Sequence, residues 1–238
     1  MKLIAHRGAS LERPENSLES LIYAAQLGAD AVECDVRPTA DGVYVIFHDD
    51  NLIRLAGLDR KVGELTYNEM KAALAGADRN LLTLEELLKD YKERTPILLH
   101  IKMNNPDDDF VNIVRRAPVE IICGVQSIQA LKTMSKVFPS DHILAFMPAK
   151  ECYPDFAENK AGIIRLWEHW LQDITPADVK EKYNVEVWIM AYKNGSLDGC
   201  VESLSLAYSL GADGMLLNNI VLGLEWRKQL ELLKDRND

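Results

Sequence analysis

Short runs of apolar residues alternate with helical patterns along this chain, and the alternation limits its fold more than any other feature. The runs are rich in Ile, Val and Leu, which is typical of strands buried in a parallel sheet. Nine candidate strands lie at residues 2–5, 31–36, 43–48, 96–103, 120–125, 142–147, 161–166, 185–191 and 213–218. Helical segments separate several of them, at about 16–28, 83–93, 128–137, 175–183 and 198–210. We therefore predict an α/β fold, a TIM (β/α)8 barrel in which one candidate is an extra strand or a wrong assignment.

The length of 238 residues suits one barrel domain over residues 1–238, because α/β barrels often reach this size as a single domain. We expect a short, partly helical insertion on the rim around residues 50–82, where no strand is obvious. The segments LGADAVECDV (27–36) and LGADGMLLNN (210–219) share a helix end, a turn and a strand start. Their likeness predicts two βα units built alike, with Asp35 corresponding to Asn218.

Composition and charge point away from several classes of protein. A net charge of −10 argues against nucleic acid or an anionic membrane surface as a partner. No apolar run is long enough for a bilayer span or a signal peptide, and there is no glycine-rich phosphate loop. The four cysteines are scattered without CxxC spacing, which favours reduced thiols and a cytoplasmic protein. The oligomeric state is left open.

Charged residues interrupt two neighbouring apolar runs. Glu33 and Asp35 lie in AVECDV, and the next run ends on His48. Because alternate residues of a strand point to one face, Glu33 and Asp35 share a side, as do His100 and Lys102 in LLHIKM. Polar residues near the carboxyl ends of barrel strands converge on the catalytic mouth. A carboxylate pair at that place usually binds a cation or has a shifted pKa.

The sequence also resembles a known family. The motifs are HRG (6–8), PENS (14–17), ECDV (33–36), TADG (39–42), HDD (48–50), LTLEELL (82–88) and HIK (100–102). In this order and at this spacing they closely resemble the signature of glycerophosphodiester phosphodiesterases. The resemblance is specific over about the first 100 residues and diffuse afterwards. That family has a TIM-barrel fold, in agreement with the pattern of strands.

The resemblance implies the hydrolysis of a small-molecule glycerophosphodiester to glycerol 3-phosphate and an alcohol. It implies His6 and His48 as the acid/base pair, Glu33 and Asp35 as ligands of one divalent metal ion, and Arg7 and Lys102 as phosphate contacts. The chemistry is coherent, because a hard cation neutralises the anionic diester. One imidazole then deprotonates the attacking group while the other protonates the leaving alkoxide.

The match breaks at His100. The family usually has Glu-x-Lys on this strand, with the Glu completing the metal site, whereas this chain has His100-Ile101-Lys102. The resemblance implies Mg²⁺ or Ca²⁺, but two carboxylates and an imidazole suit Mn²⁺, Zn²⁺ or Fe²⁺ better. The alternative is that His100 is not a ligand and that water fills the gap.

Four further positions are candidate site residues. Asn16 either contacts the phosphate or caps the helix that follows it. Glu15 either holds Arg7 in place or approaches the metal. Trp188 either walls the glycerol side of the pocket or packs in the core. Asn218 stands where the family tends to have an aspartate.

Two alternative functions stay open. One is a catalytically inactive barrel that binds a phosphodiester or a phosphorylated polyol as a sensor, which the change at His100 keeps under consideration. The other is a phospholipase-type lyase that forms a cyclic phosphate with the same histidine pair.

One question of geometry also stays open. Only RPTADG (37–42) joins the second and third candidate strands. A link that short normally makes a hairpin, because a parallel crossover needs a dozen or more residues. A hairpin is expected to put His48 at the wrong end of the barrel, unless the third strand is short and irregular or the chain descends beside the barrel.

Overall fold

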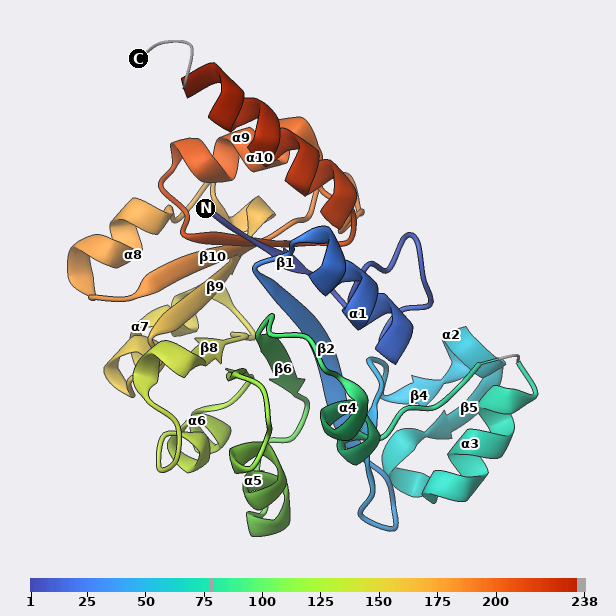
Figure 1. Cartoon of the computed structure of the whole chain (residues 1–238). Helices are drawn as coiled ribbons and strands as arrows, with labels where there is room; N and C mark the ends of the chain where they lie inside the picture. The colour runs from blue at the N-terminus through green and yellow to red at the C-terminus, as the bar shows by residue number, and fades with distance from the viewer. Residues whose placement is uncertain (78, 235–238) are drawn as a thin grey trace.

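Eight parallel strands close into a barrel in the computed structural model, which describes residues 1–77 and 79–234 (Figure 1). Around the barrel they are β1 (Lys2–Ala5), β2 (Ala31–Pro38), β6 (Ile97–Ile101), β7 (Ile121–Val125), β8 (Ile143–Ala145), β9 (Ile163–Trp167), β10 (Glu186–Met190) and β11 (Gly214–Leu217). The pairing of β11 with β1, and of β1 with β2, completes the circle. The prediction of a TIM barrel is confirmed.

Helices surround the barrel on its outer side (Figure 1). They are α1 (Leu18–Leu27), α4 (Leu84–Asp90), α5 (Asp108–Arg115), α6 (Ile128–Met134), α7 (Tyr153–Glu158), α8 (Pro176–Lys182), α9 (Val201–Ser209) and α10 (Ile220–Lys234), with 3₁₀ turns η2 (Ser140–His142), η3 (Lys150–Cys152) and η4 (Glu168–Trp170). Side chains cap several of them, and in α1 the cap is Ser17, which accepts the backbone N–H of Ser20. The expectation that Asn16 caps this helix was therefore wrong by one residue.

The candidate strand at residues 43–48 is the extra one. β3 (Tyr44–Ile46) pairs antiparallel with the end of β2, where Arg37 faces Val45. β3 takes the edge of β2 that β1 leaves after Val32, and β2 itself runs on past Val36, its last pairing with β6. After the turn the chain returns toward the barrel, and the N–H of Phe47 donates to the carbonyl of Asp35 at 2.9 Å. The hairpin returns His48 to the mouth because β3 has only three residues, so of the alternatives left open the short third strand is confirmed.

The rim insertion has a small core of its own. It contains β4 (Asn51–Leu52), α2 (Ile53–Ala56), β5 (Leu58–Lys61), η1 (Val62–Glu64) and α3 (Tyr67–Ala75), and it lies to one side of the barrel in Figure 1. Its buried apolar residues are Val45, Phe47, Leu52, Val62, Leu65, Met70, Leu74 and Leu81. Val45 and Phe47 lie on the segment that returns from the hairpin and carries His48. Packing of the insertion against them therefore fixes this segment.

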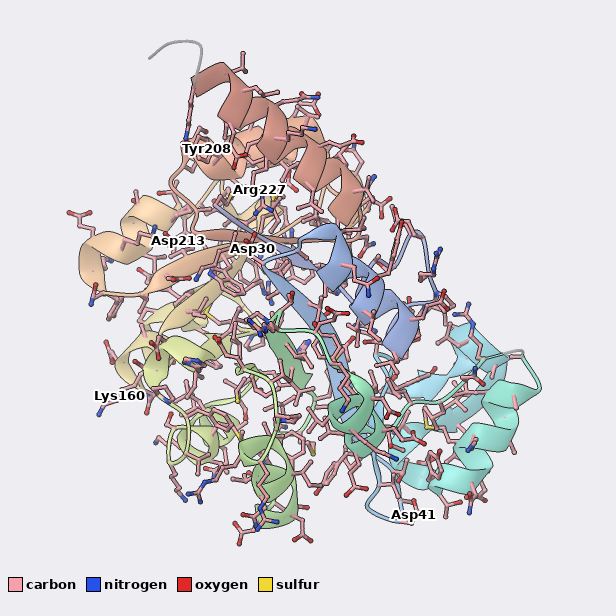
Figure 2. All side chains as sticks on the ribbon, viewed as in Figure 1. Asp30, Asp41, Lys160, Tyr208, Asp213 and Arg227 are labelled. Carbon is pink, nitrogen blue, oxygen red and sulfur yellow. The ribbon has the colours of Figure 1, made fainter. Side chains whose placement is uncertain are left out.

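The repeated LGAD segments have the same structural role (Figure 2). Asp30 accepts the backbone N–H of Leu3 at 2.7 Å, and Asp213 accepts that of Val187 at 2.8 Å. Each aspartate thus ties the start of its strand to the neighbouring strand, and Arg227 pairs with Asp30 on the outside. The predicted likeness of the two βα units is confirmed at this point.

The interior of the barrel is apolar below its carboxyl-terminal mouth. The cluster there consists of Ile4, Ala31, Leu98, Ile122, Leu144, Phe146, Ile163, Trp188, Met190 and Leu216. Above it the strands end in polar residues, so the side chains that could carry out chemistry lie at the mouth of the barrel.

None of the helices in the described residues has the length and hydropathy that crossing a bilayer requires.

Candidate active site

The end of β1 brings the first histidine and arginine to the mouth. His6 is 7% exposed, and its Nδ1 lies 2.7 Å from Oδ1 of Asn218 at the end of β11. The next two residues turn sharply, because Arg7 has φ 58° and Gly8 has φ 78°. A Cβ at Gly8 would lie 2.3 Å from Oγ of Ser20. Only glycine allows this close turn, which places the backbone N–H of Arg7 over the site.

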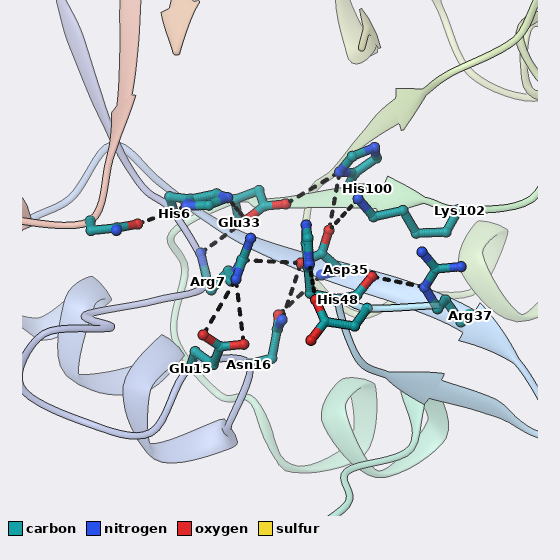
Figure 3. A network of polar contacts seen from close by, with 12 residues as sticks. His6, Arg7, Glu15, Asn16, Glu33, Asp35, Arg37, His48, His100 and Lys102 are labelled. Carbon is teal, nitrogen blue, oxygen red and sulfur yellow. Dashed lines mark hydrogen bonds and ion pairs between the residues drawn. The ribbon is translucent and has the colours of Figure 1, made fainter. Parts of the chain in front are cut away.

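Two fully buried carboxylates of β2 form the centre of the site (Figure 3). Glu33 accepts the N–H of Arg7 through Oε2 at 2.9 Å. Asp35 lies 3.1 Å from Nζ of Lys102 and 3.6 Å from Nε of Arg7. Asn16 completes the surroundings of Asp35, because its amide donates to Oδ2 and accepts the backbone N–H of Asp35, both at 3.1 Å.

His100 on β6 lies beside both carboxylates. Its Nδ1 is 3.1 Å from Oδ1 of Asp35 and 3.8 Å from Oε1 of Glu33. The imidazole stacks on Phe146, with ring centroids 3.7 Å apart and planes 15° apart. The phenyl ring fits over Gly124, where a Cβ would come within 2.5 Å of it. Gly124 and Phe146 therefore form a slot that holds the imidazole in one orientation.

This group fits a divalent cation. Glu33, Asp35 and His100 each offer a ligand atom, and these atoms lie within 4.8 Å of one another. Among the described residues, Oε1 of Glu33 accepts no hydrogen bond, and Oδ1 of Asp35 has only its ion pairs with Lys102 and His100. Buried acceptors without donors are costly unless a ligand satisfies them. Two carboxylate oxygens and an imidazole are a donor set for Mn²⁺, Zn²⁺ or Fe²⁺.

A chain of ion pairs holds the second histidine. Nδ1 of His48 lies 2.7 Å from Oδ1 of Asp49, whose other oxygen accepts Nε–H of Arg54 at 2.7 Å. Arg54 also binds Glu15 with a distance of 2.5 Å between Nη2 and Oε1. Glu15 in turn accepts from Nη1 of Arg7 at 3.3 Å. The α2 helix of the insertion thereby links His48 to the arginine of the first loop.

Burial and neighbouring charges separate the pKa values of the two carboxyl groups. Burial raises the pKa of Glu33 to about 8, and the adjacent Asp35 carboxylate adds to the rise. Burial also opposes ionisation of Asp35, but Lys102 and His100 outweigh it and hold the pKa of that carboxyl well below its usual range. Without a metal the pair therefore holds one proton near neutral pH, which a cation would displace on binding.

All three imidazoles of the site are neutral near pH 7. Burial lowers the pKa of His6 to about 3, with Arg7 adding to the effect. Burial likewise lowers the pKa of His100 to about 3 and also lowers that of His48. Each ring thus keeps one nitrogen lone pair for a proton or a cation.

The structure gathers most of the sequence-predicted site residues. Those brought together are His6, Arg7, Glu15, Glu33, Asp35, His48, His100, Lys102 and Asn218, most of them labelled in Figure 3. Asn16 is also present, but its amide bonds Asp35 rather than pointing freely toward a substrate. Trp188 lies elsewhere: it is 1% exposed, donates to Glu186 and has Nζ of Lys2 5.5 Å from its ring. The structure thus corrects the expectation that Trp188 walls the pocket and places it in the core near the strand starts.

Sequence reasoning missed the residues that hold the histidines. Asp49 and Arg54 orient His48, and Phe146 packs against His100. The doubled acid of HDD after His48 was a usable signal for Asp49. Arg54 and Phe146 gave no local signal, because their partners come from other elements of the fold.

Comparison with known proteins agrees with this geometry. Residues 6–170 match the sequence model of the family described as "Glycerophosphoryl diester phosphodiesterase family". The chain belongs to this family. It is 35% identical to mouse lysophospholipase D GDPD3 over an alignment of 131 residues that covers 49% of this chain. It is also 35% identical to the uncharacterized protein YqiK of Bacillus subtilis, covering 86% of this chain and 97% of YqiK.

Solved structures share the barrel of this family member. A phosphodiesterase of Oleispira antarctica, solved with its product sn-glycerol 3-phosphate, superposes with a TM-score of 0.73 and 21% identity over 97% of each chain. At that identity the likeness shows the fold.

The match to the mouse lysophospholipase D covers 39% of the length of that relative.

Proposed function

We propose that this protein hydrolyses glycerophosphodiesters to glycerol 3-phosphate and an alcohol, with one divalent metal ion and two histidines. The observation that supports the proposal most is the pairing of both histidines through Nδ1. Nδ1 of His6 faces the carbonyl oxygen of Asn218, and Nδ1 of His48 faces the carboxylate of Asp49. Both partners are acceptors, so each Nδ1 carries the hydrogen and each Nε2 is free to take or give a proton.

Arg7 and Lys102 supply positive charge for the diester. The guanidinium of Arg7 can fork two phosphate oxygens, and the ammonium of Lys102 acts as a point charge. Both lie against Asp35, and Glu15 holds Arg7 from the other side. The cations are thus held in place before substrate arrives, which lowers the entropy cost of binding.

The metal would be held by Glu33, Asp35 and His100, and when bound it would neutralise the diester and polarise its P–O bonds. The histidines divide the remaining chemistry. One free Nε2 takes a proton from the attacking hydroxyl or water, and the other imidazole, which first takes up a proton from solvent, gives that proton to the leaving alkoxide. Asn218 keeps its carbonyl toward His6, because its amide donates to Asp198 at 3.0 Å.

A turnover assay tests this proposal. Purified protein stripped of metal is incubated with glycerophosphocholine and Mg²⁺, Ca²⁺, Mn²⁺ or Zn²⁺ in turn, and glycerol 3-phosphate and choline are measured. Release of both products with at least one metal is the expected result. Saturable binding without product under any metal would favour the sensor. A cyclic phosphate accumulating in the phosphorus NMR spectrum would favour the lyase.

A groove beside His48 favours a second candidate, a diester whose glycerol carries an acyl chain. The groove has a volume of about 1380 Å³ and reaches His48 and Asn16. Its apolar lining includes Leu18, Ile22, Leu55, Leu74 and Leu82. The mouse relative is named a lysophospholipase D. Comparing lysophosphatidylcholine with glycerophosphocholine in wild type and in Ile22→Glu tests the idea. We expect Ile22→Glu to lower turnover of lysophosphatidylcholine alone. An equal effect of the substitution on both substrates would contradict the idea.

A further inference from the structure

Arg165 is a buried cation that the proposed mechanism does not use. It lies on β9 and is 4% exposed. Among the described residues, its Nε and Nη1 have no hydrogen-bond partner, and Nη2 has only the carbonyl of Met147 at the long distance of 3.5 Å. A guanidinium has five N–H donors, and burying one without an anionic partner costs several kcal/mol. The described surroundings thus leave Arg165 with donors in excess.

Three aromatic rings surround the guanidinium. Its Cζ lies 4.5 Å from the ring centroid of Trp167, 5.4 Å from that of Phe146 and 5.5 Å from that of Trp170. Ring faces attract a cation but accept few of its hydrogen bonds. Burial lowers the pKa of Arg165 to about 9, with no carboxylate acting against the fall. The rings therefore hold the cation in place and leave its need for an anion unmet.

Arg165 adjoins the proposed active site. Phe146 separates the two, because its ring stacks on His100 at 3.7 Å and also has Arg165 within 5.4 Å. The charge of Arg165 is close enough to help lower the pKa of His100, after burial and Lys102. A substituent that extends from the carboxylate site past the Phe146 ring, on the β8–β9 side, would approach Arg165.

We propose that Arg165 binds an anionic group, a carboxylate or a phosphate, on the alcohol half of the diester. The inference rests on the proposed function. The glycerol half of such a substrate carries no charge, and Arg7 and Lys102 serve the bridging phosphate. Only the alcohol can then bring the second anion. Arg165 offers no attraction to a quaternary ammonium alcohol, because the guanidinium already covers the ring faces that would bind it.

Two substrates that differ by one carboxylate test the inference. Glycerophosphoserine and glycerophosphoethanolamine are compared by kcat/KM in wild type, Arg165→Met and Arg165→Lys. We expect wild type to favour the serine diester by about tenfold or more, as a charge-assisted hydrogen bond provides. Arg165→Met should abolish that preference, and Arg165→Lys should keep part of it. Arg116→Met, a change at an exposed arginine, is the matched control and should leave the preference intact.

The outcomes separate this inference from the proposed function. Equal kcat/KM for both diesters in wild type, or a preference that survives in Arg165→Met, overturns the role of Arg165 and leaves the hydrolase proposal intact. If neither diester is hydrolysed, calorimetric binding of the same pair decides. If wild type binds the serine diester more tightly and Arg165→Met loses that difference, the role of Arg165 is supported. If wild type binds neither diester, both proposals are overturned. If Arg165→Met fails to fold, wild type and Arg165→Lys alone decide.

Discussion

At the scale of single residues, the free nitrogens of two histidines carry the proposed chemistry. His6→Ala and His48→Ala should each lower kcat/KM about 10²–10⁴-fold, because each variant loses one proton transfer in the transition state. The measurement is the steady-state release of choline from glycerophosphocholine. His142→Ala is the control, since His142 lies on η2, before β8 and away from the mouth, and pairs there with Glu120. Near-normal turnover without either imidazole would refute the acid/base pair.

His100 decides which metal the site prefers. His100→Glu restores the carboxylate that the family usually has, and a third carboxylate oxygen makes the site harder. We expect metal preference to move from Mn²⁺ or Zn²⁺ toward Mg²⁺ or Ca²⁺. Calorimetric titration with each ion measures the change without any substrate. An unaltered order of affinities would mean that His100 is not a ligand.

Residue patterns also limit what a sequence can tell. The acidic pair Glu33 and Asp35 was predictable, because charges inside an apolar strand need a partner. The placement of Trp188 was not, because strand alternation gives the face of a residue but not its height in the barrel. Asn16 shows the same limit: its left-handed backbone, at φ 56°, turns the amide to Asp35.

At the scale of elements, the register of three strands builds the slot for His100. β7 places Gly124 beside His100, and β8 is followed by Phe146, whose ring fills the space that a side chain at 124 would take. Gly124→Ala should move the ring and lower metal affinity about 10–100-fold, as loss of an outer contact to a metal ligand does. Gly63→Ala is the control, because a Cβ there meets nothing within 4 Å. Equal affinities in both variants would argue against the slot.

The insertion acts on catalysis through helix α2. Arg54 joins Asp49 to Glu15, so Arg54→Ala should free the carboxylate that orients His48 and lower kcat by about tenfold, a part of the acid/base contribution. Arg60→Ala, at a nearby exposed arginine with one 3.5 Å bond to a carbonyl, should not change kcat. A shifted pH–rate profile in the first variant alone would separate orientation from loss of stability. Identical profiles in both would remove Arg54 from the site.

The hairpin of β2 and β3 shows where element-level prediction stops. The short link correctly predicted a turn, since six residues cannot make a parallel crossover. What the sequence could not show is that the partner on one edge of β2 changes from β1, which pairs as far as Val32, to β3, which pairs from Val36, while β6 occupies the other edge up to Val36. That change of partner depends on the packed insertion, which lies later in the chain.

At the scale of the whole molecule, the site is assembled from segments far apart in sequence. His6 and Asn218 meet across the seam between β1 and β11, while β2 and β6 supply the ligands on the other side of β1. Closing the barrel is therefore required before the site exists. The closed barrel was predictable from the alternation of elements, whereas the single-domain organisation stays a prediction.

The buried carboxyl of Glu33 makes the stability of the whole metal-free protein depend on pH. Its pKa is about 8 in the folded state against an ordinary 4.5, so within that interval the folded chain holds a proton that the unfolded chain has released. Stability therefore falls as pH rises toward 8. His6 and His100 act in the opposite direction, but only below their ordinary value of 6.5. Between pH 6.5 and 8 the loss from Glu33 is about 2 kcal/mol.

Urea unfolding in EDTA at these two pH values measures the loss. Glu33→Gln should remove it, because an amide does not ionise, and Glu19→Gln on exposed α1 should leave it unchanged. Adding Mn²⁺ to wild type should also remove it, since a bound cation favours the ionised carboxylate. A flat profile for the metal-free wild type would mean that Glu33 is already ionised when the barrel folds. The carboxylate pair would then carry two negative charges in the metal-free barrel, balanced by Arg7 and Lys102.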